Sequence, residues 1–132
     1  HVKEPLLGEL YSSAGAYVQA SEIEGMSISL LDAMSYSRCC IVSDIPENLD
    51  ALGDSGLSFH TANIDDLARQ MRWVVQSRRA VGEIGERAKA RVLREFSWDS
   101  VTDHLEVLYR ETADLAASRR VVPNSTVTMR QA

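Results

Sequence analysis

The stretch that decides the fold is Cys39-Cys40-Ile41-Val42-Ser43-Asp44-Ile45-Pro46. Its first four residues form an uninterrupted apolar run, which is typical of a strand covered on both faces in a parallel sheet. Ser43 to Pro46 end this run, and the fixed backbone angle of Pro46 suits the first turn of a helix. The stretch therefore predicts a buried strand over 39–42, followed by a short helix that runs through Leu52.

Strand and helix signals alternate on both sides of this stretch. A helix is predicted over 4–14, a strand over 16–20 and a helix over 26–36, and a third strand follows over 57–59. This alternation predicts an α/β fold, a Rossmann-like parallel half-sheet of about three strands with flanking helices. Because so few strands make a small sheet, we expect residues outside this chain to complete it. We also expect an open sheet edge beside the strand at 39–43.

The chain after Thr61 is predicted to be helical, because its apolar residues follow the period of a helix. The predicted helices are 64–78 (apolar Leu67, Met71, Val74 and Val75), 80–95 (Ile84, Ala88 and Val92) and a third that Ser97 caps and that ends near 117 (Val101, Leu105, Leu108, Thr112 and Leu115). We expect one domain over residues 1–117. Residues 118–132 have no periodicity and are expected to form a frayed tail.

Composition favours a globular protein and argues against nucleic acids as partners. Hydrophobic residues make up 45% and charged residues 25% of 132 residues, as in globular domains. The net charge of −5 gives no general attraction to nucleic acids, so none is expected as a partner. Glutamates interleave the basic residues between 69 and 94, which favours a solvated face, with peripheral membrane contact through a longer parent protein as the alternative. We expect a cytoplasmic location.

Cys39 and Cys40 are the only cysteines. Neighbouring cysteines bridge each other only with strain, so we expect two free, buried thiols in a reducing compartment. The three histidines, His1, His60 and His104, show no metal-ligand spacing relative to them. No metal site is therefore expected.

The loop after the strand at 16–20 is the candidate binding site. In open α/β sheets, ligands bind beyond the carboxyl ends of the strands, near the start of the following helix. Gly25 permits close approach of the backbone, and the N–H groups of residues 26–28 suit a phosphate. Glu24 and Asp32 could accept hydrogen bonds from sugar or ribose hydroxyls. On spacing alone, the alternative is that Glu24 only favours the helix dipole and that Asp32 is only solvated.

The segment Glu24-Gly25-Met26-Ser27-Ile28-Ser29-Leu30-Leu31-Asp32-Ala33-Met34 resembles the Glu-Gly-Phe-Gly-x-x-x-x-Glu-Ala-Met motif of retaining GT-B glycosyltransferases, the group 1 type. The resemblance continues, in order and spacing, through 40–46, 53–57 and 96–98, and ends near 108–111. It covers about residues 7–111. Five matching segments in register indicate common ancestry, where a single short motif would be weak evidence.

This resemblance implies the later part of the C-terminal, donor-binding domain of an enzyme that moves a sugar from a nucleoside diphosphate sugar to a sugar, lipid or small-molecule acceptor. It implies retention of configuration at the anomeric carbon and no cofactor besides the donor substrate. The implied site consists of Glu24 as the catalytic residue on the donor's sugar ring; of Gly25, Met26, Ser27 and Ile28, whose amides meet the sugar or its diphosphate; and of Asp32 in place of the glutamate that holds the ribose hydroxyls.

Two parts of the family's machinery precede the region that the resemblance covers, the basic pair for the diphosphate and the acceptor-binding domain. We therefore expect the fragment alone to be inactive. Within the region, Ser37 replaces a glycine at a helix end, where a left-handed backbone would be less favourable for serine. The alternative function is a non-catalytic, degenerate relative that acts as a protein-interaction module. Self-association of the chain is also expected.

Overall fold

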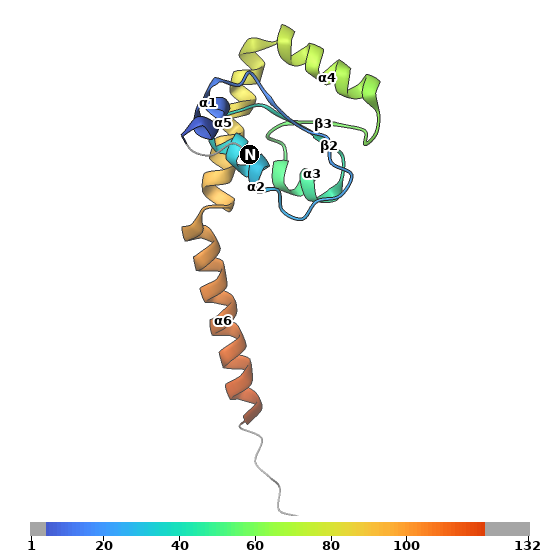
Figure 1. The fold of residues 1–132 in the computed structure, drawn as a ribbon. Helices are drawn as coiled ribbons and strands as arrows, with labels where there is room; N and C mark the ends of the chain where they lie inside the picture. Colours follow the sequence, from blue (N-terminus) through green and yellow to red (C-terminus); the bar gives the residue numbers. More distant parts are fainter. Residues whose placement is uncertain (1–4, 121–132) are drawn as a thin grey trace, which may run out of the picture. The chain divides into compact units, whose positions relative to one another are not determined.

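The computed structural model describes residues 5–120 (Figure 1). Their elements, in chain order, are α1 (Leu6–Ser13), β1 (Tyr17–Gln19), α2 (Ile28–Ser35), β2 (Cys40–Ser43), α3 (Pro46–Leu52), β3 (Leu57–Phe59), α4 (Ile64–Gln76), α5 (Arg78–Glu95) and α6 (Trp98–Arg120). The chain consists of two compact units, and the boundary between them lies between Ser97 and Trp98. Most of the predicted tail, from residue 121 on, lies outside the described residues, and α6 continues to Arg120.

The three strands form one parallel sheet in the order β1-β2-β3. Tyr17 pairs with Cys40 across the first ladder, and Ile41 pairs with Leu57 across the second. All four residues of β2 are buried, as an uninterrupted apolar run predicts for a strand covered on both faces. The predicted α/β half-sheet with flanking helices is confirmed. The open edge expected beside the strand at 39–43 is wrong, because β2 is paired on both sides; the open edges of the described sheet belong to β1 and β3.

The core lies on the side of the sheet where α2, α3 and α5 gather. Its buried apolar residues are Leu30, Ala33 and Met34 of α2, Cys40 and Val42 of β2, Ala51 and Leu52 of α3, and Ala88 and Val92 of α5. Helix α3 begins with Pro46 at its first turn, as predicted. Helix α5 buries Ile84, Ala88 and Val92 and packs against α2, so the predicted apolar face of this helix is confirmed.

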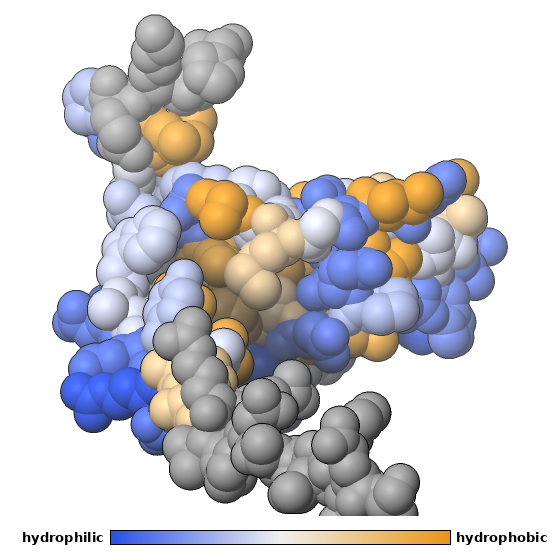
Figure 2. Space-filling model, turned by 90° about the horizontal axis from the view of Figure 1, so that it is seen from below, coloured by the Kyte–Doolittle hydropathy of each residue, from blue (hydrophilic) through white to orange (hydrophobic). Residues whose placement is uncertain are grey.

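Two of the four residues of the predicted apolar face of α4 are partly buried, and the other two are exposed. Met71 and Val75 are 47% and 75% exposed, and the one buried residue of α4 is Asp66. The reason is tertiary, since Asp66 accepts a hydrogen bond from the backbone N–H of His60 after β3 and pairs with Arg69. This polar contact attaches the start of α4 to the sheet, while apolar residues farther along the helix stay in solvent. Other hydrophobic side chains also reach the surface among hydrophilic ones (Figure 2).

The second unit, as far as it is described, is helix α6. Leu105, Leu108 and Leu115 of its predicted apolar stripe are all about half exposed or more. An ion pair joins Arg110 to Glu106 one turn earlier. Neither α6 nor any other helix within residues 5–120 has the length and apolarity needed to cross a membrane.

Candidate binding loop at the carboxyl edge of the sheet

The three parallel strands end at one edge of the sheet, which is where their following loops meet. Gln19, Ser43 and Phe59 are the last residues of β1, β2 and β3, and all three are buried. The loop from β1 to α2, residues 20–27, carries Glu24 and is tied to the neighbouring strand, because Ser43 Oγ donates a hydrogen bond to the carbonyl oxygen of Ser21. The sequence-predicted loop therefore lies at the predicted edge.

The Glu24 carboxylate is held by one of its two oxygens. Ser21 Oγ donates to Glu24 Oε1 at 2.6 Å, and Gln19 Nε2 donates to the same oxygen at 3.4 Å. Glu24 is only partly exposed, and its other oxygen, Oε2, accepts no hydrogen bond from residues 5–120. A carboxylate with one oxygen fixed and the other unpaired can accept a hydrogen bond from a ligand hydroxyl.

The start of α2 offers backbone donors beside Glu24. Ser27 is the N-cap, and its side chain accepts a hydrogen bond from the N–H of Leu30. The N–H groups of Gly25, Met26, Ser27 and Ile28 donate to no protein atom in the described part of the chain. Unpaired amides at a helix start favour an anion, and an anion site at this position stays a prediction.

The side chains of the residues that carry these amides differ in their exposure to solvent. Met26 and Ile28 are 60% and 66% exposed, whereas Ser27 is buried and donates through Oγ to Gln19 Oε1 at 2.8 Å. A Cβ atom on Gly25 would meet nothing within 4 Å. Gly25 is exposed, and no close packing within the protein demands glycine here.

Asp32 lies one turn further into α2 and is partly exposed. Its backbone carbonyl accepts hydrogen bonds from the N–H of Tyr36 and from Ser35 Oγ, but its carboxylate accepts none from the described residues. No hydrogen bond joins it to Glu24. The two predicted carboxylates thus belong to one loop-and-helix segment, and each keeps at least one oxygen without a hydrogen-bond donor in the described chain.

Sequence reasoning missed two residues beneath this loop, Gln19 and Asn48. Both are buried, at 7% and 1% exposure, and Gln19 Nε2 donates to Asn48 Oδ1 at 3.0 Å. Asn48 Nδ2 in turn donates to Ser43 Oγ at 3.0 Å and to the Ser43 carbonyl at 3.3 Å. The available signal was a glutamine inside a predicted strand, a polar residue that is costly to bury unless it is hydrogen-bonded.

A second polar cluster connects the ends of β2 and β3. Asp44 Oδ2 lies 2.8 Å from His60 Nδ1, and Asp44 Oδ1 accepts from the N–H and the hydroxyl of Thr61, both at 2.8 Å. The hydrogen bond from His60, with those from Thr61, holds the pKa of Asp44 well below its ordinary value. The same hydrogen bond, and the negative charge of Asp44, raise the pKa of His60.

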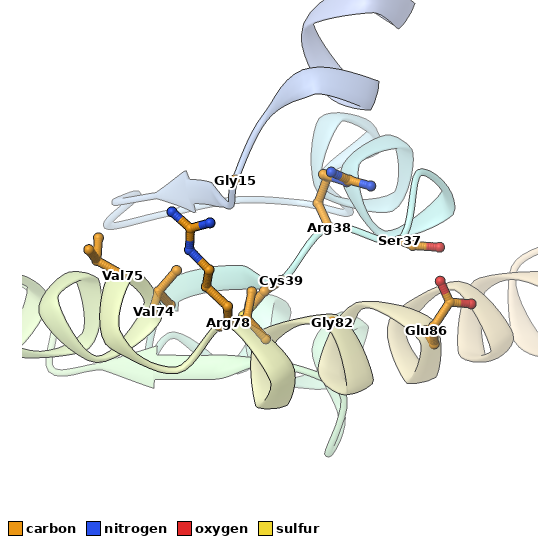
Figure 3. Close-up of a pocket in the computed structure, with 10 residues that line it drawn as sticks. Gly15, Ser37, Arg38, Cys39, Val74, Val75, Arg78, Gly82 and Glu86 are labelled. Atoms are coloured by element: carbon orange, nitrogen blue, oxygen red, sulfur yellow. The ribbon is translucent and has the colours of Figure 1, made fainter.

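Two cavities lie at opposite edges of the sheet. A cavity of about 120 Å³ adjoins the candidate loop and is lined in part by Ala20, Glu22 and Ser43. A larger one, of about 520 Å³, opens at the amino edge, where Gly15 and Cys39 precede β1 and β2 (Figure 3). No predicted site residue lines either cavity, so the candidate site is the open loop itself.

The two cysteines are free and buried, as predicted. Burial raises the pKa of Cys39 to about 11 and that of Cys40 to about 12. Thiols with such pKa values are protonated at neutral pH and act as small apolar side chains.

The chain is similar in fold to a solved structure and in sequence to a known protein family. The fold is similar to that of sucrose-phosphate synthase from Thermosynechococcus elongatus, with a TM-score of 0.77 and 20% sequence identity. The match covers 87% of this chain and 29% of that one, so the chain spans less than a third of that protein's length. The family model for glycosyl transferases group 1 matches residues 1–91, more than half of the sequence, and the chain therefore belongs to that family.

Proposed function

We propose that the chain supplies part of the donor site of a retaining GT-B glycosyltransferase, as the later part of the C-terminal domain. The reaction would move a sugar from a nucleoside diphosphate sugar to an acceptor, with no other cofactor. The proposal rests on one observation: a carboxylate fixed through one oxygen lies in the same segment as four unpaired backbone amides, three at the end of the loop and one at the first residue of α2. The carboxylate suits sugar hydroxyls, and the amides suit a diphosphate.

The proposed site residues contact different parts of the donor. Glu24 Oε2 accepts a hydrogen bond from the donor's sugar ring, and the N–H groups from Gly25 to Ile28 donate to the sugar or its diphosphate. Asp32 accepts from the ribose hydroxyls. Its side chain is one methylene shorter than the glutamate of the family motif, so a bridging water or a closer approach of the ribose is needed. The acceptor site and the remaining donor contacts belong to parts of the protein beyond these 132 residues, and the cytoplasmic location is part of the same proposal.

The test is calorimetric titration of the chain with UDP, GDP and ADP, each with and without an attached hexose. We expect saturable binding of one nucleotide sugar. Glu24→Ala should weaken it about tenfold or more, because a hydrogen bond to a charged group contributes about 1.5–3 kcal/mol. Glu22→Ala is the matched control, since Glu22 is an exposed glutamate in the same loop.

Gly25→Ala separates binding from folding. The added methyl group has room in the protein, so the unfolding temperature should change little, while a ligand that needs the bare backbone should bind more weakly. Binding that Glu24→Ala leaves unchanged would show that this loop is not the donor site. No binding to any nucleotide would favour the alternative, an interaction module that keeps the fold.

A further inference from the structure

Gln19 uses every hydrogen-bonding position of its side chain. A primary amide can donate two hydrogen bonds and accept two. In Gln19 all four are made with different partners: Oε1 accepts from Ser27 Oγ at 2.8 Å and from the Tyr17 hydroxyl at 3.1 Å, and Nε2 donates to Asn48 Oδ1 at 3.0 Å and to Glu24 Oε1 at 3.4 Å. With the residue 7% exposed, water has little access to this amide.

The direction of these hydrogen bonds is set by the backbone of β2. The Ser43 carbonyl can only accept, so the Asn48 amide must turn its Nδ2 toward it. Asn48 Oδ1 then faces Gln19 and can only accept, which requires Nε2 of Gln19 at that contact. The second N–H of Nε2 is thereby available to Glu24, and Oε1 is left for Ser27. A chain of fixed polarity thus runs from the central strand to the loop carboxylate.

We propose that Gln19 is a positioning residue of the donor site, an inference that rests on the proposed function. Through one amide it holds Oε1 of Glu24 and the hydroxyl of Ser27, the residue that caps α2. The hydrogen bond to Glu24 restrains the carboxylate that meets the sugar. The cap of α2, in which Ser27 Oγ accepts from the N–H of Leu30, does not require Gln19. Ser21 restrains the same Glu24 oxygen from within the loop, and Gln19 adds a restraint that comes directly from β1.

The test compares Gln19→Leu with Gln70→Leu in the same chain. Gln70 is a matched control because its Nε2 makes one hydrogen bond, to the carbonyl of Ser58, at 3.0 Å and away from the loop. The ligand is the nucleoside diphosphate that the chain binds, with and without its hexose, measured by calorimetry alongside thermal unfolding. Gln19→Leu is also made in the Glu24→Ala background.

We expect Gln19→Leu to weaken binding of the nucleotide sugar about tenfold and to leave the bare nucleotide unaffected, because the loss acts through Glu24 on the sugar. In the Glu24→Ala background the same change should cost no further sugar affinity. A merely structural role would weaken both ligands alike, would be additive with Glu24→Ala, and would overturn the proposal. Gln70→Leu should leave both affinities as they are.

A crystal structure of the ligand-free Gln19→Leu variant tests the proposal without any nucleotide. We expect the Glu24 carboxylate to leave its wild-type position, and an unmoved carboxylate would overturn the proposal. Failure of the proposed function shows itself differently, as absent nucleotide binding by the wild type or binding that is indifferent to Glu24→Ala. In either case the crystallographic comparison still decides whether Gln19 positions the loop.

Discussion

Two glycines in helix α5 should respond in opposite ways to the same substitution. A Cβ atom on Gly85 would lie 2.0 Å from the carbonyl oxygen and 2.8 Å from the carbonyl carbon of Ser37, in the turn between α2 and β2. A Cβ atom on Gly82, three residues earlier, would meet nothing within 4 Å. Gly85 is buried and Gly82 is exposed. Gly82→Ala therefore reports the effect of helix propensity alone, and Gly85→Ala reports helix propensity together with packing.

The expected change in the free energy of unfolding has two contributions, the helix propensity of alanine and the packing of its methyl group. Alanine is favoured over glycine inside a helix by about 1 kcal/mol, and this gain applies to both sites. At Gly85 the new methyl group overlaps backbone atoms, which cannot rotate away, so α5 must move from the turn. Overpacking of this kind costs about 3 kcal/mol, the upper part of its usual range. Gly82→Ala should thus stabilise the protein by about 1 kcal/mol, and Gly85→Ala should destabilise it by about 2 kcal/mol.

The assay is urea unfolding followed by far-UV circular dichroism, with the free energy extrapolated to water. The two variants should differ by about 3 kcal/mol, with unchanged m-values, or by about 10 °C in thermal unfolding for a chain of this size. Equal stability of Gly85→Ala and Gly82→Ala would refute the close approach of α5 to the turn. A changed m-value would mean that the denatured state had changed instead.

Two further predictions concern the turns that surround the sheet. Ser37 has φ +57°, so Ser37→Gly should stabilise the protein by about 0.5–1 kcal/mol in the same urea assay, and any loss of stability would contradict the strain argument. The Asp44–His60 pair should stabilise the fold only within a pH window. Because the pKa of Asp44 is lowered, its contribution is lost as pH falls through that folded-state value; because the pKa of His60 is raised, its contribution is lost as pH rises through the folded-state value. NMR titration should give His60 a pKa above 6.5 that falls in Asp44→Asn, and an unchanged His60 titration in that variant would disprove the pairing.

The features that the sequence predicted well are those that local chemistry determines. The buried strand β2 follows from an apolar run that needs cover on both of its faces, and the start of α3 follows from Pro46. The left-handed backbone at Ser37 follows from its place just after a helix, where the family has glycine. The Glu24 loop likewise follows a strand and opens a helix, so its place at the sheet edge could be expected.

The features that the sequence did not predict depend on contacts between distant segments. The period of α4 is that of an amphipathic helix, yet it is Asp66 that is buried, because a backbone N–H beyond β3 needs an acceptor. Gln19 is similar. In a strand of three residues, alternation gives too little information to assign a glutamine to the inner side. Hydrogen bonds from distant residues make that position favourable, above all the one to Asn48, which lies 29 residues later in α3.

The network beneath the loop also bears on the departures from the family motif. Ser27 stands where the motif has glycine, and an added side chain among the amides proposed to bind the donor would favour a degenerate domain if it occupied the loop's open side. Here Ser27 is 9% exposed, and its hydroxyl is used by the protein itself, as cap of α2 and as donor to Gln19. The amides around it remain unpaired in the described chain. The serine is therefore compatible with a working donor site, provided that Gln19 Oε1 accepts the hydrogen bond from its hydroxyl. In Ser27→Gly, Gln19 loses its hydrogen bond from Ser27 but keeps those to Asn48 and Glu24. The variant should therefore bind the nucleotide sugar as the wild type does, as long as these two hydrogen bonds still fix the Glu24 carboxylate.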